Sequence, residues 1–512
     1  MNNTAAQEIA AGYATEGAAL ELGSVVVDGS VDPSARVRIP FATLNRHGLV
    51  AGATGTGKTK TLQGIAEQLS AAGVPVLLAD VKGDLSGMAR PGEGGEKIES
   101  RAKDTGDDWT PTAFPVEFLS LGGGSAAVPI RATLTQFGPI LLSKVLDLND
   151  TQESTLGLIF HWADQRGLPL LDTKDLRAVI QHLTSDEGKV DLKGIGGVSS
   201  ATAGVILRAL VNLEAQGGDD FFGEPEFEPG DLLRQVDGKG VVTLLELAEQ
   251  QANPRLWSTF LMWLLAELFE ELPEAGDLDK PKLVCFLDEA HLLFDGASKA
   301  FLERIEQTVK LIRSKGVGVF FCTQLPTDVP NAVLSQLGAR IQHALRAFTP
   351  EDQAALAKTV KTYPTTKNYD LEEALTTLGT GEAVVTVLSE RGAPTPVAWA
   401  RMRAPRSLMA AIGPDAVAAA AKTSPLYAKY GETVDRESAY EKLTARIAEQ
   451  PAPAPADAPP PEAPAPPPER AEPSFVEKAF ESPVVRSFMR SAASALGREI
   501  TRGLFGTKRR RR

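Results

Sequence analysis

The sequence predicts an α/β fold with a mainly parallel sheet that is covered by helices on both faces. Short apolar runs alternate with longer segments of helical character, which is typical of strands joined by crossover helices. Most runs are continuously apolar, as expected for strands buried on both faces. The expected strands are HGLVAGA (47–53), VPVLLAD (74–80), PVEFLSL (115–121), GVVTLLEL (240–247), KLVCFLDE (282–289), GVGVFFCT (316–323) and ARIQHALRA (339–347). A later pair, EAVVTVLSE (382–390) and TPVAWAR (395–401), is expected to add antiparallel strands at an edge.

Composition places the chain among globular cytoplasmic proteins. It has 512 residues, 43% of them hydrophobic, and two cysteines, which are too few for a disulfide framework. The start, MNNTAAQEIAAGYATEG, lacks the basic and apolar regions of a signal peptide. The longest apolar stretch, WSTFLMWLLAELF (257–269), is too short to span a bilayer. The net charge of −13 does not favour a protein coated in nucleic acid, but it leaves room for a few basic groups in a pore.

Shifts in pattern divide the chain into seven expected segments. Residues 131–233 have helical character throughout and therefore look like an insertion into the α/β core. The proline-rich tract PAPAPADAPPPEAPAPPPE is expected to be an extended, stiff spacer. The expected segments are an N-terminal β segment (1–45), a first α/β-core segment (46–130), the helical insertion (131–233), a second α/β-core segment (234–405), a helical extension (406–450), a Pro/Ala-rich linker (451–470) and a basic amphipathic tail (471–512).

One segment matches the phosphate-binding loop G-x-x-x-x-G-K-[ST] at every fixed position. It follows an apolar run and precedes a helical segment, which is the context that this motif requires. Backbone N–H groups of such a loop wrap phosphates, the lysine neutralises them, and the final hydroxyl ligates Mg²⁺. We therefore expect ATP and Mg²⁺ as cofactors. The expected nucleotide-binding residues are Gly52, Ala53, Thr54, Gly55, Thr56, Gly57, Lys58, Thr59 and Thr61, with Thr59 also a metal ligand.

An acidic pair ends the apolar run KLVCFLDE. Asp288 is expected to hold Mg²⁺, and Glu289 is placed to polarise the attacking water. A glutamate directly after the aspartate favours the RecA-like (ASCE-type) branch of P-loop ATPases, in which an extra strand lies between the two motifs. The next strand ends in Thr323 and Gln324, of which Gln324 is the better candidate for sensing the γ-phosphate.

Three further positions allow two interpretations each. Arg313 ends a helical segment, where it either complements the helix dipole or acts as an arginine finger on a neighbouring subunit. DVKGD (80–84) follows a strand at the carboxyl edge of the sheet, where ligand sites gather. It is either a solvated turn or, as its resemblance to segments of conjugative coupling ATPases implies, a segment near the nucleotide or at a subunit contact. His47 and His291 have no companions at metal-ligand spacing and are interpreted as structural.

The order of four segments gives the chain a specific resemblance over roughly residues 20–403. HGLVAGATGTGKT, LLADVKGDLSG, LVCFLDEAHLLF and LIRSKGVGVFFCTQLPTDVP resemble the HerA/FtsK superfamily of hexameric ATPases, and within it bacterial HerA-like proteins catalogued as a domain of unknown function. The resemblance implies nucleotide-site roles for Lys58, Asp288, Glu289 and Gln324. It implies that Arg313 and Arg46 match arginines of these proteins, with Arg46 used in trans.

The resemblance also implies a function. It indicates a homohexamer that hydrolyses ATP and translocates or unwinds double-stranded DNA, often with a nuclease partner. The residues leave open a motor or scaffold that remodels proteins, which could be held at a membrane surface by the tail. The segment that ends in KRRRR has apolar residues near helical spacing with arginines between them, which suits a membrane surface, a nucleic-acid backbone or a partner groove.

Overall fold

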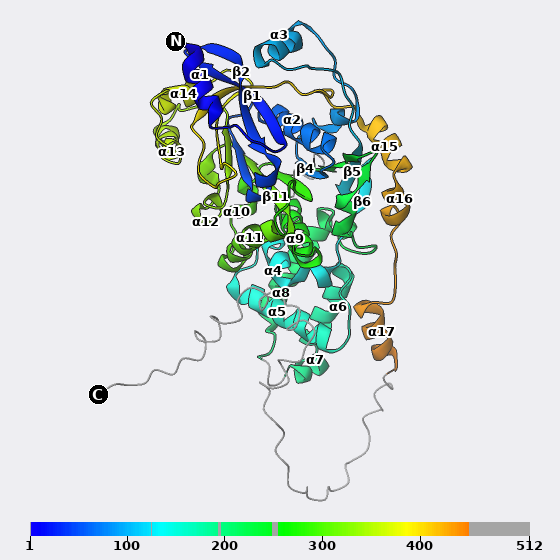
Figure 1. Ribbon diagram of the computed structural model, residues 1–512. Helices are drawn as coiled ribbons and strands as arrows, with labels where there is room; N and C mark the ends of the chain where they lie inside the picture. The colour runs from blue at the N-terminus through cyan, green and yellow to red at the C-terminus, as the bar shows by residue number, and fades with distance from the viewer. Residues whose placement is uncertain (1, 124, 193–195, 248–253, 450–512) are drawn as a thin grey trace, which may run out of the picture. The chain divides into compact units, whose positions relative to one another are not determined.

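A computed structural model of the chain describes residues 2–123, 125–192, 196–247 and 254–449. Its main feature is a twelve-stranded sheet in the order β2-β1-β14-β13-β12-β3-β11-β10-β4-β9-β5-β6 (Figure 1). The strands from β12 to β6 in this order are parallel, and β13, β14, β1 and β2 extend one side in antiparallel fashion. The α/β fold with a mainly parallel sheet is therefore confirmed.

Every strand that the apolar runs predict is present. The predicted antiparallel pair is also present, as β13 and β14. One run gives a shorter strand than expected, because the chain leaves the sheet after Gln342 and turns along the glycine-rich loop. The strands of the main sheet are β1 (Ala19–Val27), β2 (Ser30–Pro40), β3 (Gly48–Ala51), β4 (Val76–Asp80), β5 (Val116–Leu121), β6 (Val128–Ile130), β9 (Val242–Glu246), β10 (Leu283–Leu287), β11 (Val317–Thr323), β12 (Ala339–Gln342), β13 (Glu382–Val387) and β14 (Ala398–Met402).

The chain divides into two compact units. The first consists of Met1–Ala132 and Gln216–Val434 and contains the whole sheet. A helix that the sequence did not predict, α1 (Asn2–Ala11), lies beside β1 and β2 (Figure 1). The other helices of this unit are η1 (Phe41–Arg46), α2 (Lys58–Ala71), η2 (Ser86–Ala89), α3 (Glu96–Thr105), η3 (Gly218–Asp220), η4 (Pro229–Leu233), α9 (Pro254–Glu271), α10 (His291–Phe294), α11 (Lys299–Ile312), η6 (Arg313–Lys315), η7 (Pro326–Asp328), α12 (Asn331–Leu334), α13 (Pro350–Val360), α14 (Leu371–Thr377), α15 (Pro414–Thr423) and α16 (Pro425–Tyr430).

The described portion of the second unit is helical. It comprises residues of 133–215 together with residues from 435 on, and α17 (Ala439–Glu449) packs on α6 (Thr173–Thr184). The buried Asp175 carboxylate on α6 accepts the Tyr440 N–H at 2.8 Å, which holds the two segments together. The other helices are α4 (Leu134–Val145), α5 (Asp150–Gln165), α7 (Asp186–Asp191) and α8 (Ser200–Ala215). The predicted proline-rich linker and basic tail lie outside the described residues.

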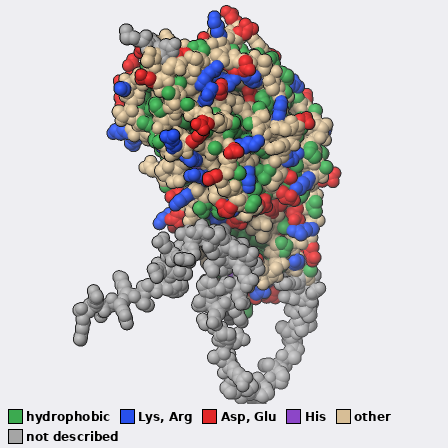
Figure 2. Space-filling view, viewed as in Figure 1, with side chains coloured by type: hydrophobic (Ala, Val, Ile, Leu, Met, Phe, Trp, Pro, Cys, Tyr) green, Lys and Arg blue, Asp and Glu red, His purple; other side chains and the backbone are tan. Residues whose placement is uncertain are grey.

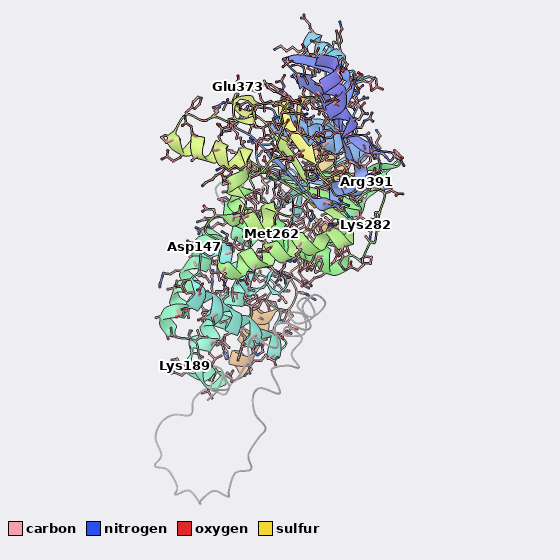
Figure 3. All side chains as sticks on the ribbon, turned by 60° about the vertical axis from the view of Figure 1, so that its left-hand side comes forward. Asp147, Lys189, Met262, Lys282, Glu373 and Arg391 are labelled. Atoms are coloured by element: carbon pink, nitrogen blue, oxygen red, sulfur yellow. The ribbon has the colours of Figure 1, made fainter. Side chains whose placement is uncertain are left out.

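Charged side chains of both signs are spread over the molecular face seen in Figure 2, with Lys and Arg interspersed among Asp and Glu. This mixture agrees with the acidic net charge of −13. Among residues 2–123, 125–192, 196–247 and 254–449, none of the helices combines the length and the apolar character that crossing a membrane would need. The most apolar stretch of the sequence forms the buried helix α9, on which Met262 lies (Figure 3).

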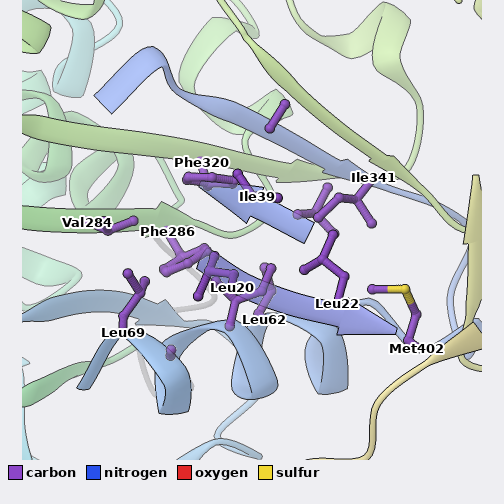
Figure 4. Packing of buried hydrophobic residues seen from close by; sticks show 14 of the residues in the cluster. Leu20, Leu22, Ile39, Leu62, Leu69, Val284, Phe286, Phe320, Ile341 and Met402 are labelled. Atoms are coloured by element: carbon purple, nitrogen blue, oxygen red, sulfur yellow. The ribbon is translucent and has the colours of Figure 1, made fainter. Parts of the chain in front are cut away.

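The core fixes the helix that follows the glycine-rich loop. Leu62 and Leu69 on α2 are buried in one cluster with Phe286 of β10 and Phe320 of β11 (Figure 4). Each such side chain contributes roughly 1.5–3 kcal/mol by leaving water. The amino end of α2 is thereby held at the carboxyl edge of the sheet, where the polar residues of the predicted site gather.

Candidate nucleotide-binding site

The glycine-rich loop joins β3 to α2 and is bound on both sides by the ends of neighbouring strands. The Gly52 N–H donates to the Thr323 and Gln324 carbonyls at 3.2 and 3.1 Å, after β11. The Ala53 N–H donates to the Ala344 carbonyl at 2.9 Å, after β12. The loop is therefore a fixed element of the sheet edge.

Glycine is required at two loop positions in particular. A Cβ at Gly52 would lie 2.6 Å from His343 Cβ, closer than any real contact. Gly57, where α2 begins, has φ 114° and would place a Cβ 3.0 Å from the Gly381 amide nitrogen. Because these residues carry no side chain, the loop stays open at the helix N-terminus, where backbone N–H groups favour an anion. The loop fits a chain of phosphates.

Lys58 is buried and folds back over the loop. Its Nζ donates to the Gly52 carbonyl and, at 3.3 Å, to the Ala53 carbonyl. Burial and the positive charge of Lys82 lower the pKa of Lys58, while Asp288 and Glu289 oppose this shift. The charges of Lys58, Lys82, Asp288 and Glu289 therefore affect one another. The Lys58 ammonium lies at the loop, where it can contact an anionic ligand.

A buried histidine supports the loop from the side of β12. His343 Nδ1 donates to the Glu382 carbonyl at 2.8 Å, so the neutral ring accepts the Thr61 hydroxyl at Nε2 over 3.0 Å. Burial lowers the pKa of His343 to about 4, and the ring is neutral near pH 7. Thr61, which the sequence predicts as a nucleotide contact, has its hydroxyl bound to this ring.

The acidic pair follows β10, and β11 lies between β10 and β3. This is the extra strand that the adjacent glutamate predicts. Asp288 is partly buried and accepts the Glu289 N–H at 2.9 Å. Burial raises the pKa of Asp288 to about 6, against the lowering effect of Lys82. Glu289 has φ 47°, a left-handed conformation that non-glycine residues rarely adopt outside strained or functional sites.

The chemistry of the donors suits Mg²⁺. Thr59 supplies a partly exposed hydroxyl at the start of α2, and Asp288 supplies a carboxylate after β10. Both are oxygen ligands, which Mg²⁺ prefers, and both stand at the carboxyl edge of the sheet. The remaining ligands of such an ion would be phosphate oxygens and water.

The DVKGD segment forms a hydrogen-bonded turn, and its lysine contacts the acidic pair. The Asp80 carboxylate accepts the Gly83 N–H at 2.8 Å and the Leu85 N–H at 2.9 Å, and Gly83 has φ 72°. Lys82 Nζ lies 3.5 Å from Glu289 Oε1. The segment is therefore a turn, but its Asp80 is buried instead of solvated, and its Lys82 lies beside the predicted catalytic glutamate. A role near the nucleotide stays a prediction.

The predicted sensor lies after β11. The Thr323 hydroxyl donates to the Asp328 carboxylate at 2.6 Å, and the Leu325 N–H donates to the same oxygen at 2.9 Å. The Gln324 side chain is exposed, and its carbonyl is bound to the loop at Gly52. Of the two polar residues, Gln324 therefore keeps the side chain available for a ligand.

The two predicted arginines lie at the opposite edge of the sheet. Arg46 ends η1 just before β3, and its carbonyl accepts the N–H of Gly338, which precedes β12. Arg313 follows α11 before β11 and is exposed. Lys282 before β10 and Arg391 in the β13–β14 hairpin belong to the same edge (Figure 3). Each parallel strand rises about 3.3 Å per residue, so β3 keeps Arg46 roughly 13 Å from the loop of its own chain.

Three residues at the site were not predicted as functional from the sequence. Lys82 and His343 contact predicted site residues, and Arg346 donates to the Thr54 carbonyl at 3.2 Å. His291, which the sequence treats as structural, has its Nδ1 3.5 Å from Glu289 Oε2. Their place after strands that end at the carboxyl edge is a signal that could have found them, and for Lys82 the sequence had already singled out the DVKGD segment.

Fold and site together define a RecA-like P-loop ATPase fold. The chain matches the family described as Helicase HerA-like C-terminal over residues 27–512, and it therefore belongs to that family. No curated protein matches the chain.

Solved structures share the fold at low sequence identity. The bacterial conjugative coupling protein TrwB is 14% identical, with 79% of this chain and 94% of that chain covered and a TM-score of 0.52. TrwB in complex with ADP and Mg²⁺ is 15% identical, with coverage of 80% and 93% and a TM-score of 0.51. VirB4 of Thermoanaerobacter pseudethanolicus is 16% identical, with coverage of 76% and 98% and a TM-score of 0.50.

Proposed function

We propose that the chain is an ATP-hydrolysing HerA-like motor that works as a homohexamer and translocates along or unwinds DNA. The observation that carries the proposal is the arrangement of charged groups on the sheet. The phosphate loop, Asp288, Glu289 and Gln324 follow strand ends at one edge, and two arginines stand at the other.

The residues divide the work of hydrolysis. Lys58 neutralises phosphate oxygens, and the loop amides orient them. Thr59 and Asp288 would hold Mg²⁺, which when bound would offset the negative charge of the phosphates. Glu289 accepts the proton of the attacking water, and the exposed Gln324 amide contacts the terminal phosphate. TrwB has been solved with ADP and Mg²⁺ and with a non-hydrolysable ATP analogue, which supports the same cofactors here.

The arginines give a reason for assembly. Arg46 and Arg313 lie before β3 and β11, whereas the phosphate loop follows β3. The length of the strands therefore separates both arginines from the loop of the same chain. They can act at a nucleotide only when a neighbouring subunit presents its carboxyl edge to them. A closed ring repeats this head-to-tail contact, which supports the hexamer that family membership suggests.

The polymer that the motor moves is proposed to be double-stranded DNA. ATP turnover should be measured with duplex DNA, single-stranded DNA, RNA and anionic lipid vesicles. Duplex DNA is expected to raise the rate several-fold, with binding that weakens steeply as salt increases. Stimulation by vesicles alone would favour a membrane-associated motor that acts on proteins. Turnover that ignores every nucleic acid, with or without residues 471–512, would exclude the DNA motor. A nuclease could bind such a motor as a partner.

A further inference from the structure

The carboxylate of Glu289 is engaged on both of its oxygens by residues of its own chain. Lys82 Nζ lies 3.5 Å from Oε1, and His291 Nδ1 lies 3.5 Å from Oε2. The Glu289 side chain is 17% exposed, whereas the Lys82 side chain is 39% exposed. The His291 side chain is 40% exposed, so the carboxylate is enclosed while both of its partners have access to solvent.

The backbone also limits where this carboxylate can point. Glu289 has φ 47°, and its N–H is bound to the Asp288 carboxylate at 2.9 Å. A backbone in this sparsely populated region persists only when its surroundings hold it, and such residues cluster at functional sites. Rotation of the Glu289 side chain is therefore the remaining freedom, and its contact with Lys82 opposes that rotation.

Lys82 is held independently of the acidic pair. It belongs to the turn after β4, the strand next to β10, and the Asp80 carboxylate fixes that turn through the Gly83 and Leu85 amides. The flexible Lys82 side chain joins the turn to Glu289. The lysine can leave without disturbing the fold, because the backbone bonds of the turn do not involve its side chain.

A general base must offer a free oxygen to the water from which it takes a proton. The Glu289 carboxylate faces an ammonium at one oxygen and an imidazole at the other, so neither of its oxygens is free to accept that proton. We propose that Lys82 is a positioning residue that restrains the Glu289 carboxylate, and that hydrolysis accelerates when the Lys82 ammonium leaves it. This inference rests on the proposed ATPase function and adds a control point to it.

The test measures kcat and KM for Mg·ATP in the full chain without any polymer. Lys82→Met and Lys82→Gln remove the charge, and Lys82→Arg keeps it. The matched control is Lys299→Met, which removes the lysine from the exposed Lys299–Glu303 pair at 3.8 Å on α11. Loss of the restraint is expected to raise kcat about fivefold in both uncharged variants, equivalent to about 1 kcal/mol, with KM within about twofold. Lys299→Met should match the unmodified chain, and Lys82→Arg, which keeps the charge, should give a kcat below that of the two uncharged variants.

Two results would overturn the inference. A fall of kcat in the uncharged variants, with KM unchanged, would make Lys82 a group that assists the reaction. A tenfold rise in KM would make it a phosphate ligand. Thermal melting identifies variants that fail to fold. If Lys82→Met is unfolded, the conclusion is drawn from Lys82→Gln. Glu289→Gln distinguishes failure of the proposed function from failure of this inference. ATP turnover that survives Glu289→Gln would contradict the proposed function. If Glu289→Gln is inactive and the uncharged Lys82 variants have a lower kcat, only the proposed restraint by Lys82 is contradicted.

Discussion

The Thr323 hydroxyl donates a 2.6 Å hydrogen bond to the carboxylate of Asp328. This bond closes the turn after β11, and the neighbouring Gln324 side chain is exposed. The sequence offered both Thr323 and Gln324 as the residue that senses the γ-phosphate, and the structure gives the two residues different surroundings. Thr323 maintains the turn, and Gln324 is the candidate ligand contact.

Substitution should separate these roles. Gln324→Ala is expected to lower kcat roughly 100-fold, the effect of losing one donor to a developing charge, with little change in ATP affinity. Thr323→Val is expected to lower the free energy of unfolding by about 1 kcal/mol, because the partly buried Asp328 carboxylate loses a donor. Steady-state kinetics and urea unfolding measure the two effects. Equal loss of kcat in both variants would argue against this division.

Gly57→Ala should abolish nucleotide binding. The residue has φ 114°, which is strained for alanine, and its new Cβ would lie 3.0 Å from the Gly381 nitrogen. Equilibrium dialysis or fluorescence with a labelled ATP should show at least a tenfold weaker complex. The matched control is Gly64→Ala on the same helix, where a Cβ meets nothing within 4 Å and binding should be retained. Normal binding by Gly57→Ala would show that the loop can relax.

Arg46 and Arg313 should act across a subunit contact. An assembly made only of Arg46→Ala chains is expected to bind ATP, because the phosphate loop lies at the other edge of the sheet and is unchanged. It is expected not to hydrolyse ATP, because no subunit supplies Arg46 to its neighbour. Lys58→Ala alone is expected to lose binding. Mixed assemblies of the two should regain some of the activity, since Lys58→Ala subunits still supply Arg46 to intact loops.

The same mixture made with Arg313→Ala tests the second arginine. Absence of any recovery, together with light scattering that shows a monomer with and without Mg·ATP, would exclude action in trans for both residues.

Two buried histidines should make stability depend on pH. Burial lowers the pKa of His47 and of His343 to about 4, while an unfolded histidine titrates near 6.5. Between these values the unfolded chain binds a proton that the folded chain does not. Stability is therefore full above pH 6.5 and falls as the pH drops toward 4.

His343→Gln removes one of these contributions. Between pH 7 and pH 5 the variant should lose about 2 kcal/mol less unfolding free energy than the unmodified chain, as measured by urea titration at each pH. The control is His161→Gln on α5 of the helical unit, a partly exposed position whose substitution should leave the slope unchanged. An identical slope for His343→Gln would mean that the ring takes up its proton at the same pH in the folded and unfolded chains.

Local sequence was sufficient for the fold because each strand of a parallel sheet is a continuous apolar run. The positions of Lys58, Asp288 and Glu289 follow from motif spacing, since each residue directly precedes or follows such a run. Residues that join the motifs across the sheet could not be found in this way. Lys82 and Glu289 are brought together by the pairing of β4 with β10, and His343 meets Thr61 through the pairing of β12 with β3.

The position of the arginines also needed the structure. Arg46 is close to the loop in sequence, yet the strand between them places it at the other edge of the sheet. Helix α1 escaped prediction because its residues are small and polar, with weak helical patterning, and it is held by packing on β1 and β2.

Movement along DNA is the most direct measure of the proposed motor. A third strand bound to one end of a duplex is displaced when a motor moves along that duplex, and fluorescence follows its release. With Mg·ATP, the full chain should displace the strand, and Glu289→Gln should bind the same duplex and displace nothing. Hydrolysis of ATP with no displacement from any duplex, by a chain that binds it, would contradict the account.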